Sequence, residues 1–272
     1  MTSALVPGPT GALTVDDGGP ARSTDPLPVV LVHSMAGNTA QWSAQLGHLR
    51  RARRAIALDI RGHGRSDPPK DGDYSLTGMA ADIGAVVEKL NLKKIVLVGH
   101  SMGGGVALAY AGAHPDRVAG LLLLDPVGDG KQISPAEAEP LLDRLNTEYD
   151  TTIIEYWTGI AGPDGAIRQR LLDDLCATPQ ETVVKSFREV LRFDPDPWLA
   201  RYQGPILSVV TPYNDEPFSL HRLGKGFPHQ VVQGTGHWIQ LNKPDVFNRI
   251  LDKFLENCVS GTRAGVRGKR GK

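Results

Sequence analysis

A five-residue segment constrains the fold more than any other part of this sequence. The segment GHSMG at residues 99–103 follows directly on the apolar, β-branched run 95–98. Glycine on both sides of Ser101 permits a strand to turn sharply into a helix, because a Cβ atom at either position would collide with nearby backbone. The turn holds Ser101 in a strained conformation beside the free N–H groups that begin the helix. The segment therefore predicts a strand over 95–98, a helix over 101–113 and a reactive serine between them.

Further apolar runs have the pattern of buried strands. Each is continuous rather than alternating, as expected for strands of a parallel sheet that is covered on both faces. These runs are 28–33, 55–58, 121–124, 206–210 and 230–232, and helix-like stretches at 41–49 and 76–90 separate the earlier ones. The alternation predicts right-handed crossovers and a doubly wound, mostly parallel α/β sheet. Residues 13–15 are expected to add an antiparallel edge strand and 245–257 a final covering helix.

The regular alternation stops between residues 126 and 203. Four segments with helical spacing occur there, at 135–145, 147–159, 164–176 and 179–191. Because this insertion leaves the carboxyl end of a strand, where open α/β sheets bind ligands, it predicts a helical lid over 126–203. The alternative is a peripheral helical addition that does not contact the site. Residues 1–125 and 204–259 would then form the core domain.

Composition excludes several classes of partner. In the 272 residues, 30 Lys and Arg balance 30 Asp and Glu, so no nucleic-acid partner is expected. No run approaches the ~20 apolar residues that span a bilayer, so no membrane partner is expected either. The two cysteines lie far apart, which favours a reduced, cytoplasmic protein without a metal site. The basic, glycine-rich segment 260–272 is expected to be a disordered tail.

Four motifs occur in an order that is typical of one large family. They are HSMAG at residues 33–37, DIRGHGRS at 59–66, GHSMG at 99–103 and GTGHW at 234–238. Together they resemble the α/β-hydrolase fold family, and the resemblance covers roughly residues 28–255. It implies an α/β-hydrolase sheet with a helical lid inserted between two strands. Ser34 departs from the family pattern, which has glycine there, and is expected either to change the backbone of the oxyanion loop or to add a hydroxyl near it.

The resemblance implies roles for the residues of the motifs. Ser101 would be the nucleophile and His237 the base that takes its proton. The backbone N–H of Met102 would form half of an oxyanion hole, and the resemblance assigns the other half to Met35. The two methionine side chains either line an acyl pocket or fill the core. Trp157 in the lid, Trp238 beside the base, and Ser34 are the other expected substrate contacts.

The triad acid has two candidates, both in the order serine, acid, histidine. Asp215 follows the strand 206–210 in a loop that resembles the usual acid loop of the family, and it is slightly preferred. A strict alignment, however, puts Asn214 in the acid position. Asp125 ends the strand 121–124, where some family members keep their acid. Both aspartates remain candidates from the sequence.

The sequence thus predicts a serine hydrolase that cleaves a carboxylic ester, lactone or thioester of a small, largely apolar molecule through an acyl-enzyme on Ser101. No metal and no cofactor are expected, because no ligand cluster and no dinucleotide-binding glycine pattern occurs. A monomer or a homodimer is expected. The alternative is a non-hydrolytic member of the family, either a ligand receptor or an enzyme with lyase, peroxidase or cofactor-independent oxygenase chemistry.

Overall fold

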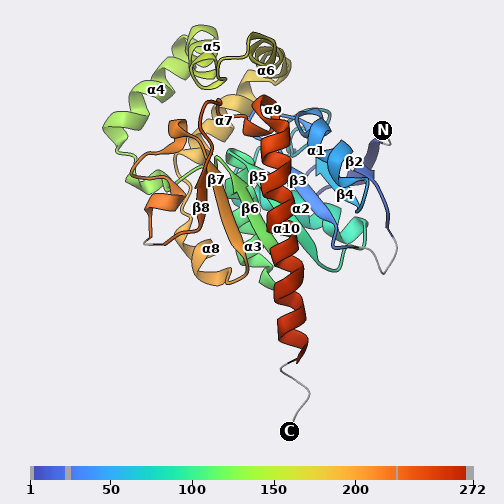
Figure 1. Cartoon of the computed structure of the whole chain (residues 1–272). Coiled ribbons are helices and arrows are strands. Elements are labelled where there is room, and N and C mark those ends of the chain that lie inside the picture. The colour runs from blue at the N-terminus through green and yellow to red at the C-terminus, as the bar shows by residue number, and fades with distance from the viewer. Residues whose placement is uncertain (1–2, 22–25, 225, 268–272) are drawn as a thin grey trace.

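The computed structural model describes residues 3–21, 26–224 and 226–267, and within them one eight-stranded sheet organises the chain (Figure 1). The strand order is β1-β2-β4-β3-β5-β6-β7-β8. Strands β3 to β8 are parallel, whereas β2 pairs antiparallel with both β1 and β4. The strands are β1 (Ser3–Pro7), β2 (Ala12–Gly18), β3 (Val29–Val32), β4 (Ala55–Leu58), β5 (Ile95–His100), β6 (Val118–Leu124), β7 (Ile206–Val210) and β8 (His229–Val231).

Each face of the sheet has its own hydrophobic core, because successive side chains of a strand point to opposite faces. Val30 and Val32 of β3 lie in one buried cluster, and Val29 and Leu31 lie in the other. The first face is covered by α2 (Leu76–Lys89) and α3 (Met102–Ala113), and the second by α1 (Ser43–Leu49) and α10 (Pro244–Arg267). Figure 1 shows α10 crossing in front of the sheet. The continuous apolar runs of the central strands follow from this double coverage.

Helix α2 illustrates how the local sequence sets the element boundaries. The side chain of Ser75 accepts a hydrogen bond from the Gly78 N–H and caps the first turn. Buried Met79, Ile83 and Val86 recur at the spacing of one helical face. After the helix, Asn91 has a φ of 51°, a conformation that asparagine tolerates better than most residues and that ends the helical path.

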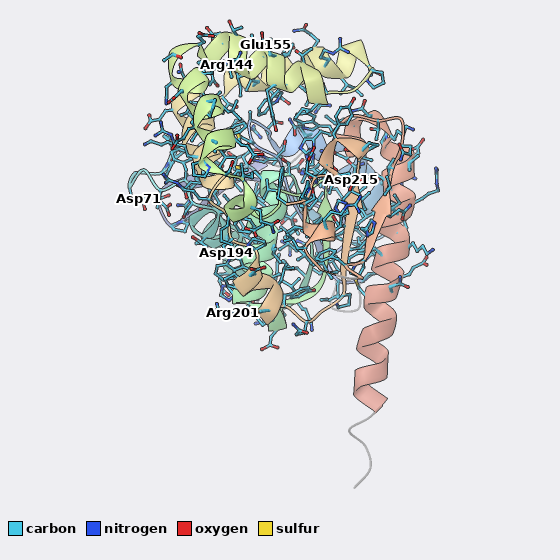
Figure 2. All side chains as sticks on the ribbon, turned by 90° about the vertical axis from the view of Figure 1, so that its left-hand side faces the viewer. Asp71, Arg144, Glu155, Asp194, Arg201 and Asp215 are labelled. Carbon is cyan, nitrogen blue, oxygen red and sulfur yellow. The ribbon has the colours of Figure 1, made fainter. Side chains whose placement is uncertain are left out.

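The segment between β6 and β7 is helical, in agreement with the sequence. Its helices are α4 (Pro135–Thr147), α5 (Tyr149–Ile160), α6 (Gly165–Ala177), α7 (Gln180–Val190) and α8 (Asp196–Arg201). Figure 1 shows α4, α5 and α6 arching over one end of the sheet. An ion pair of 2.9 Å between Arg144 and Glu155, both labelled in Figure 2, joins α4 to α5. In contrast, α8 packs against α3, so the last part of the predicted lid lies with the core.

The two ends of the chain differ from the sequence prediction. Strand β1 was not predicted, and it pairs with β2 as an additional edge strand. Helix α10 continues to Arg267, whereas the sequence predicts a disordered tail from residue 260. The remainder of the predicted tail, residues 268–272, lies outside the described residues. Within the part described, no helix is both long and apolar enough to cross a membrane.

Candidate active site

Ser101 lies at the strained turn that the sequence predicts. It connects β5 to α3 with a φ of 54° and a ψ of −120°. A Cβ atom on Gly99 would collide with the carbonyl of Gly103, and one on Gly103 would collide with the carbonyl of His33. Glycine at both positions therefore lets the strand, the helix and the loop after β3 approach closely. The strain is concentrated at Ser101, as expected of a nucleophile elbow.

His237 is hydrogen-bonded to Asp125. Its Nδ1 atom donates to Oδ2 of the aspartate over 2.7 Å, because a carboxylate can only accept. Asp125 follows β6 with a φ of 43°, and its side chain is completely buried. Two further bonds of 2.7 Å reach this carboxylate, from the N–H of Thr211 to Oδ1 and from its hydroxyl to Oδ2. Three donors thus replace water around the buried charge.

Asp215 lies elsewhere, and this corrects the preference for it as the partner of His237. Its carboxylate accepts two hydrogen bonds from Arg222, at 2.6 and 2.7 Å, and one of 3.0 Å from His221. Hydrogen bonds from Arg222, and secondly from His221, lower the pKa of Asp215. Its side chain is 44% exposed, and Figure 2 shows its position in the loop after β7. The 3₁₀ turn Pro212–Asn214 carries Asp215 past the end of the strand.

A cavity of about 340 Å³ brings Ser101, Asp125 and His237 together, and residues of α4, α5 and α7 also line it. Four of the other predicted residues line it, namely Ser34, Met35, Trp157 and Trp238. Met102 does not; its side chain is completely buried in the core, so only its backbone N–H remains available to the site. Most of the wall is apolar, and no lysine or arginine of the described chain lines it.

Several cavity residues were not predicted from the sequence. They include Tyr156 and Phe187 from the 126–203 segment and Tyr213, Glu216 and Phe218 from the loop after β7. The lid residues carry no motif, because only the helical spacing is visible in the sequence. Asn214 does not meet His237; its amide donates a bond of 2.9 Å to the carbonyl of Pro126 and so braces the residue next to Asp125.

Ser34 connects the loop after β3 to the lid. Its hydroxyl accepts a bond of 3.2 Å from Nε1 of Trp238 and donates one of 3.4 Å to Gln41. Gln41 in turn donates a bond of 2.9 Å to Asp174 of α6. Glycine at position 34 has no side chain and could bond neither to Trp238 nor to Gln41. The departure from the family pattern therefore links the loop after β3 to Trp238 and, through Gln41, to α6.

His100 connects the elbow to the base loop. Its Nε2 atom donates to the carbonyl of His237 over 3.0 Å, while Nδ1 accepts from Gln240 over 3.1 Å. The rings of His100 and His237 lie 4.7 Å apart. Burial, and secondly the neighbouring His237, lower the pKa of His100. A neutral His100 with its proton on Nε2 satisfies both bonds, so the residue before the nucleophile also holds the backbone of the predicted base.

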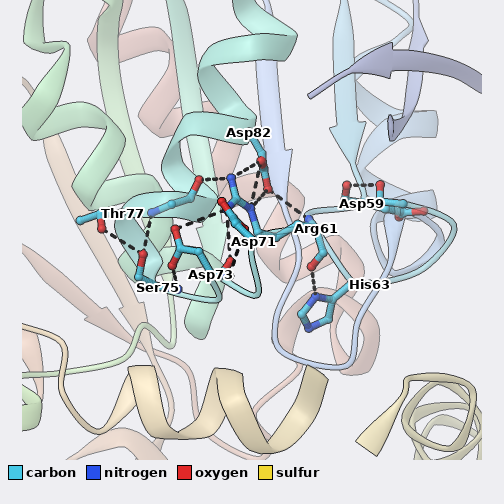
Figure 3. A network of polar contacts seen from close by, with 10 residues as sticks. Asp59, Arg61, His63, Asp71, Asp73, Ser75, Thr77 and Asp82 are labelled. Atoms are coloured by element: carbon cyan, nitrogen blue, oxygen red, sulfur yellow. Dashed lines mark hydrogen bonds and ion pairs between the residues drawn. The ribbon is translucent and has the colours of Figure 1, made fainter. Parts of the chain in front are cut away.

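Charged residues of the loop 59–66 make ion pairs and hydrogen bonds that stabilise the fold, and they are not among the residues that line the cavity (Figure 3). Buried Arg61 makes an ion pair of 2.7 Å with buried Asp82, and a longer one of 3.5 Å with Asp73. Asp59 accepts bonds from the N–H groups of Thr39 and Arg65. Such contacts tie the loop to α2 and to the turn after β3.

Comparison with known proteins identifies the family. A family model described as alpha/beta hydrolase fold matches residues 28–152. The chain is 26% identical over 270 residues to a Bacillus subtilis (strain 168) protein provisionally named 2-succinyl-6-hydroxy-2,4-cyclohexadiene-1-carboxylate synthase, covering 89% of this chain and 97% of that protein. It is 32% identical over 261 residues to the uncharacterized protein Rv2715 of Mycobacterium tuberculosis (strain ATCC 25618 / H37Rv), covering 84% of this chain and 75% of that protein.

Solved structures agree with this assignment. The structure titled "Est816 as an N-Acyl homoserine lactone degrading enzyme" matches with a TM-score of 0.80 at 24% identity, covering 92% of this chain and all of that one. The chain belongs to the α/β-hydrolase fold family and is an enzyme of that superfamily.

Proposed function

We propose that the protein is a serine hydrolase that cleaves an ester, lactone or thioester of a small, largely apolar molecule. One observation carries the proposal: the bond of 2.7 Å between His237 and a buried Asp125 lies in the same cavity as Ser101 at the elbow. An aspartate on Nδ1 leaves Nε2 of the histidine as the free acceptor that a general base needs. Such a base makes a serine hydroxyl a competent nucleophile.

In the proposed mechanism, Ser101 attacks the carbonyl carbon of the substrate and its proton passes to Nε2 of His237. The negative charge that develops on the carbonyl oxygen is stabilised by the backbone N–H groups of Met102 and Met35, each donor contributing about 3 kcal/mol. His237 then protonates the leaving alcohol or thiol, and the acyl group remains on Ser101. A water molecule that His237 deprotonates hydrolyses this acyl-enzyme and regenerates the serine.

The cavity supports a small and uncharged substrate. Its volume of about 340 Å³ lies near the lower end of the range for ligand pockets. Its walls are mostly apolar, and the charged side chains that line it, Asp125, Glu137 and Glu216, are acidic. An anionic substrate would find no cationic partner on the lining of the described cavity, and its desolvation would be costly.

A second candidate is a non-hydrolytic reaction, because the Bacillus subtilis relative is named as a synthase. That name specifies a carboxylate, and carboxylates in apolar sites are commonly bound by arginine. Because no arginine or lysine of the described chain lines this cavity, the composition of the wall supports ester hydrolysis over this alternative.

Active-site labelling tests the proposal. A fluorophosphonate probe should label the wild-type protein and fail to label Ser101→Ala or heat-denatured wild type. Steady turnover of p-nitrophenyl acetate and butyrate should disappear with the same substitution. A wild-type protein that neither reacts with the probe nor turns over these esters would contradict the proposal, and turnover that survives Ser101→Ala would contradict the mechanism.

A further inference from the structure

The backbone of His237 is held on both sides by other segments. Its N–H donates a hydrogen bond of 2.8 Å to the carbonyl of Ile160, the last residue of lid helix α5. Its carbonyl accepts the bond of 3.0 Å from His100. His237 lies in a loop between β8 and the short helix Ile239–Asn242, without ladder or helix bonds of its own. The position of the ring therefore depends on these contacts and on Asp125.

The lid turn and the base loop approach each other backbone to backbone. Gly162, with a φ of 91°, faces Gly236, and a Cβ atom on Gly162 would lie 2.6 Å from the N atom of Gly236. A Cβ atom on Gly236 would collide with the carbonyl of Ala161. The side chain of Asn242 bridges the same two segments, with bonds of 3.3 Å to the Ala161 carbonyl and 3.1 Å to the Trp238 carbonyl. Two glycines and one amide thus form the contact.

We propose that the lid turn 160–162 is a positioning element for the catalytic base, in which Gly162 and Asn242 hold the backbone of His237 in register with Asp125 and Ser101. The inference rests on the proposed function, in which His237 is the base. It assigns the lid a second role besides covering the substrate, because the lid supplies the acceptor for the His237 N–H. A residue that acts in this way changes catalysis without contacting the substrate.

Positioning has a measurable consequence for the reaction. The imidazole must meet the Asp125 carboxylate at Nδ1 and the Ser101 hydroxyl at Nε2, and a displacement of about 1 Å can cost about 10²-fold in rate. Adding a methyl group at Gly162 would push the turn away from Gly236 and draw the N–H of His237 with it. The rate constant for chemistry, kcat, should then fall more than KM rises, because no side chain that lines the cavity is replaced.

The chain offers a matched control for this substitution. Gly159 lies three residues earlier, in α5, and a Cβ atom there would meet no atom within 4 Å. Gly162→Ala and Gly159→Ala therefore add the same methyl group to neighbouring positions, but only the first touches the base loop. With p-nitrophenyl acetate, we expect kcat of Gly162→Ala to fall by about 10²-fold and kcat of Gly159→Ala to match the wild type. Equal kcat values for Gly162→Ala and the wild type would overturn the proposal.

A readout without turnover separates this inference from the proposed function. The proton on Nδ1 of His237, shared with Asp125, should give a low-field proton NMR resonance in the wild type and in Gly159→Ala. The resonance should shift or broaden in Gly162→Ala and in Asn242→Ala. The asparagine variant removes hydrogen bonds without adding bulk, so it keeps the test valid if Gly162→Ala fails to fold. An unchanged resonance in Asn242→Ala would overturn the inference, whereas a wild type without esterase activity would overturn the proposed function alone.

Discussion

The hydroxyl of Thr211 donates a hydrogen bond of 2.7 Å to the same carboxylate oxygen of Asp125 that accepts from His237. Thr211 follows β7, the strand after which the family resemblance places the usual acid, whereas Asp125 follows β6. In this protein the residue directly after β7 is Thr211, and it donates two hydrogen bonds to Asp125, which follows the neighbouring strand β6. These two hydrogen bonds hold the carboxylate of Asp125 within reach of His237, so Thr211 helps to orient that carboxylate.

The substitution Thr211→Val tests whether the Thr211 hydroxyl orients Asp125, because valine has nearly the same shape as threonine and lacks the hydroxyl. A hydrogen bond to a charged group contributes about 1.5–3 kcal/mol, so kcat for p-nitrophenyl acetate should fall by about 10- to 10²-fold. Thr211→Ser keeps the donor and should stay close to the wild-type kcat. Steady-state kinetics of the three proteins decide the matter, and a fully active valine variant would show that the backbone N–H of residue 211 suffices.

The two aspartates give a direct comparison. Asp125→Asn presents an amide to Nδ1 of His237 and favours the wrong tautomer, a change that lowers kcat by about 10⁴-fold in the Ser-His-Asp enzymes. Asp215→Asn weakens the exposed pair with Arg222 and leaves an amide oxygen that can still accept the hydrogen bond from His221, so kcat and the free energy of unfolding should both stay close to the wild-type values. Turnover and urea unfolding of both variants provide the measurement. A loss of kcat in the Asp215 variant instead would reassign the acid.

The sequence predicted the parts of the fold that have strong local patterns. Continuous apolar runs identify the central strands, because both of their faces are covered, and the glycines around Ser101 identify the elbow. Strand β1 was missed because an edge strand of five residues that contains one proline has little pattern of its own. The continuation of α10 was missed because its last turns are rich in glycine and charge rather than in apolar residues.

The choice of acid could not be made from the sequence, for a physical reason. Asp125 and Asp215 both follow a strand of the sheet, and the distance to His237 depends on how each loop leaves its strand. The turn Pro212–Asn214 directs Asp215 toward Arg222, and the positive φ of Asp125 directs its side chain toward His237. Long-range contacts of this kind, like those of Tyr156 in the lid, have no signature in local residue spacing.

Ser34 should contribute to stability through Trp238. The indole N–H of buried Trp238 loses its acceptor in Ser34→Ala, and an unpaired buried donor costs about 1–3 kcal/mol. Ser34→Gly restores the residue typical of the family but also frees the backbone, so it should be destabilised by about 0.5–1 kcal/mol more. Urea unfolding at neutral pH measures both. If the alanine variant is as stable as the wild type, the contact between Ser34 and Trp238 makes no net contribution to the free energy of unfolding.

Two buried histidines should make the fold sensitive to acid. Burial lowers the pKa of His33 to about 4, and burial together with the nearby His33 lowers the pKa of His63 to about 3. The ordinary value of 6.5 applies to the unfolded chain, which therefore binds protons that the folded protein cannot accept as the pH falls below it. The free energy of unfolding should decrease between about pH 6.5 and about pH 4, by about 1.4 kcal/mol per pH unit for each histidine, and should be insensitive to both above that range.

His63→Asn removes one of these titrating groups. The asparagine amide can replace Nδ1 of His63, which donates a bond of 2.9 Å to the Arg61 carbonyl, while the Nε2 atom that the variant loses has no hydrogen-bond partner among the described residues. Below about pH 6.5, urea unfolding should show a slope that is smaller than in the wild type by about 1.4 kcal/mol per pH unit. Exposed His229 provides the control, because His229→Asn should leave the slope unchanged. Equal slopes in all three proteins would mean that His63 takes up its proton in the folded state as readily as in the unfolded chain.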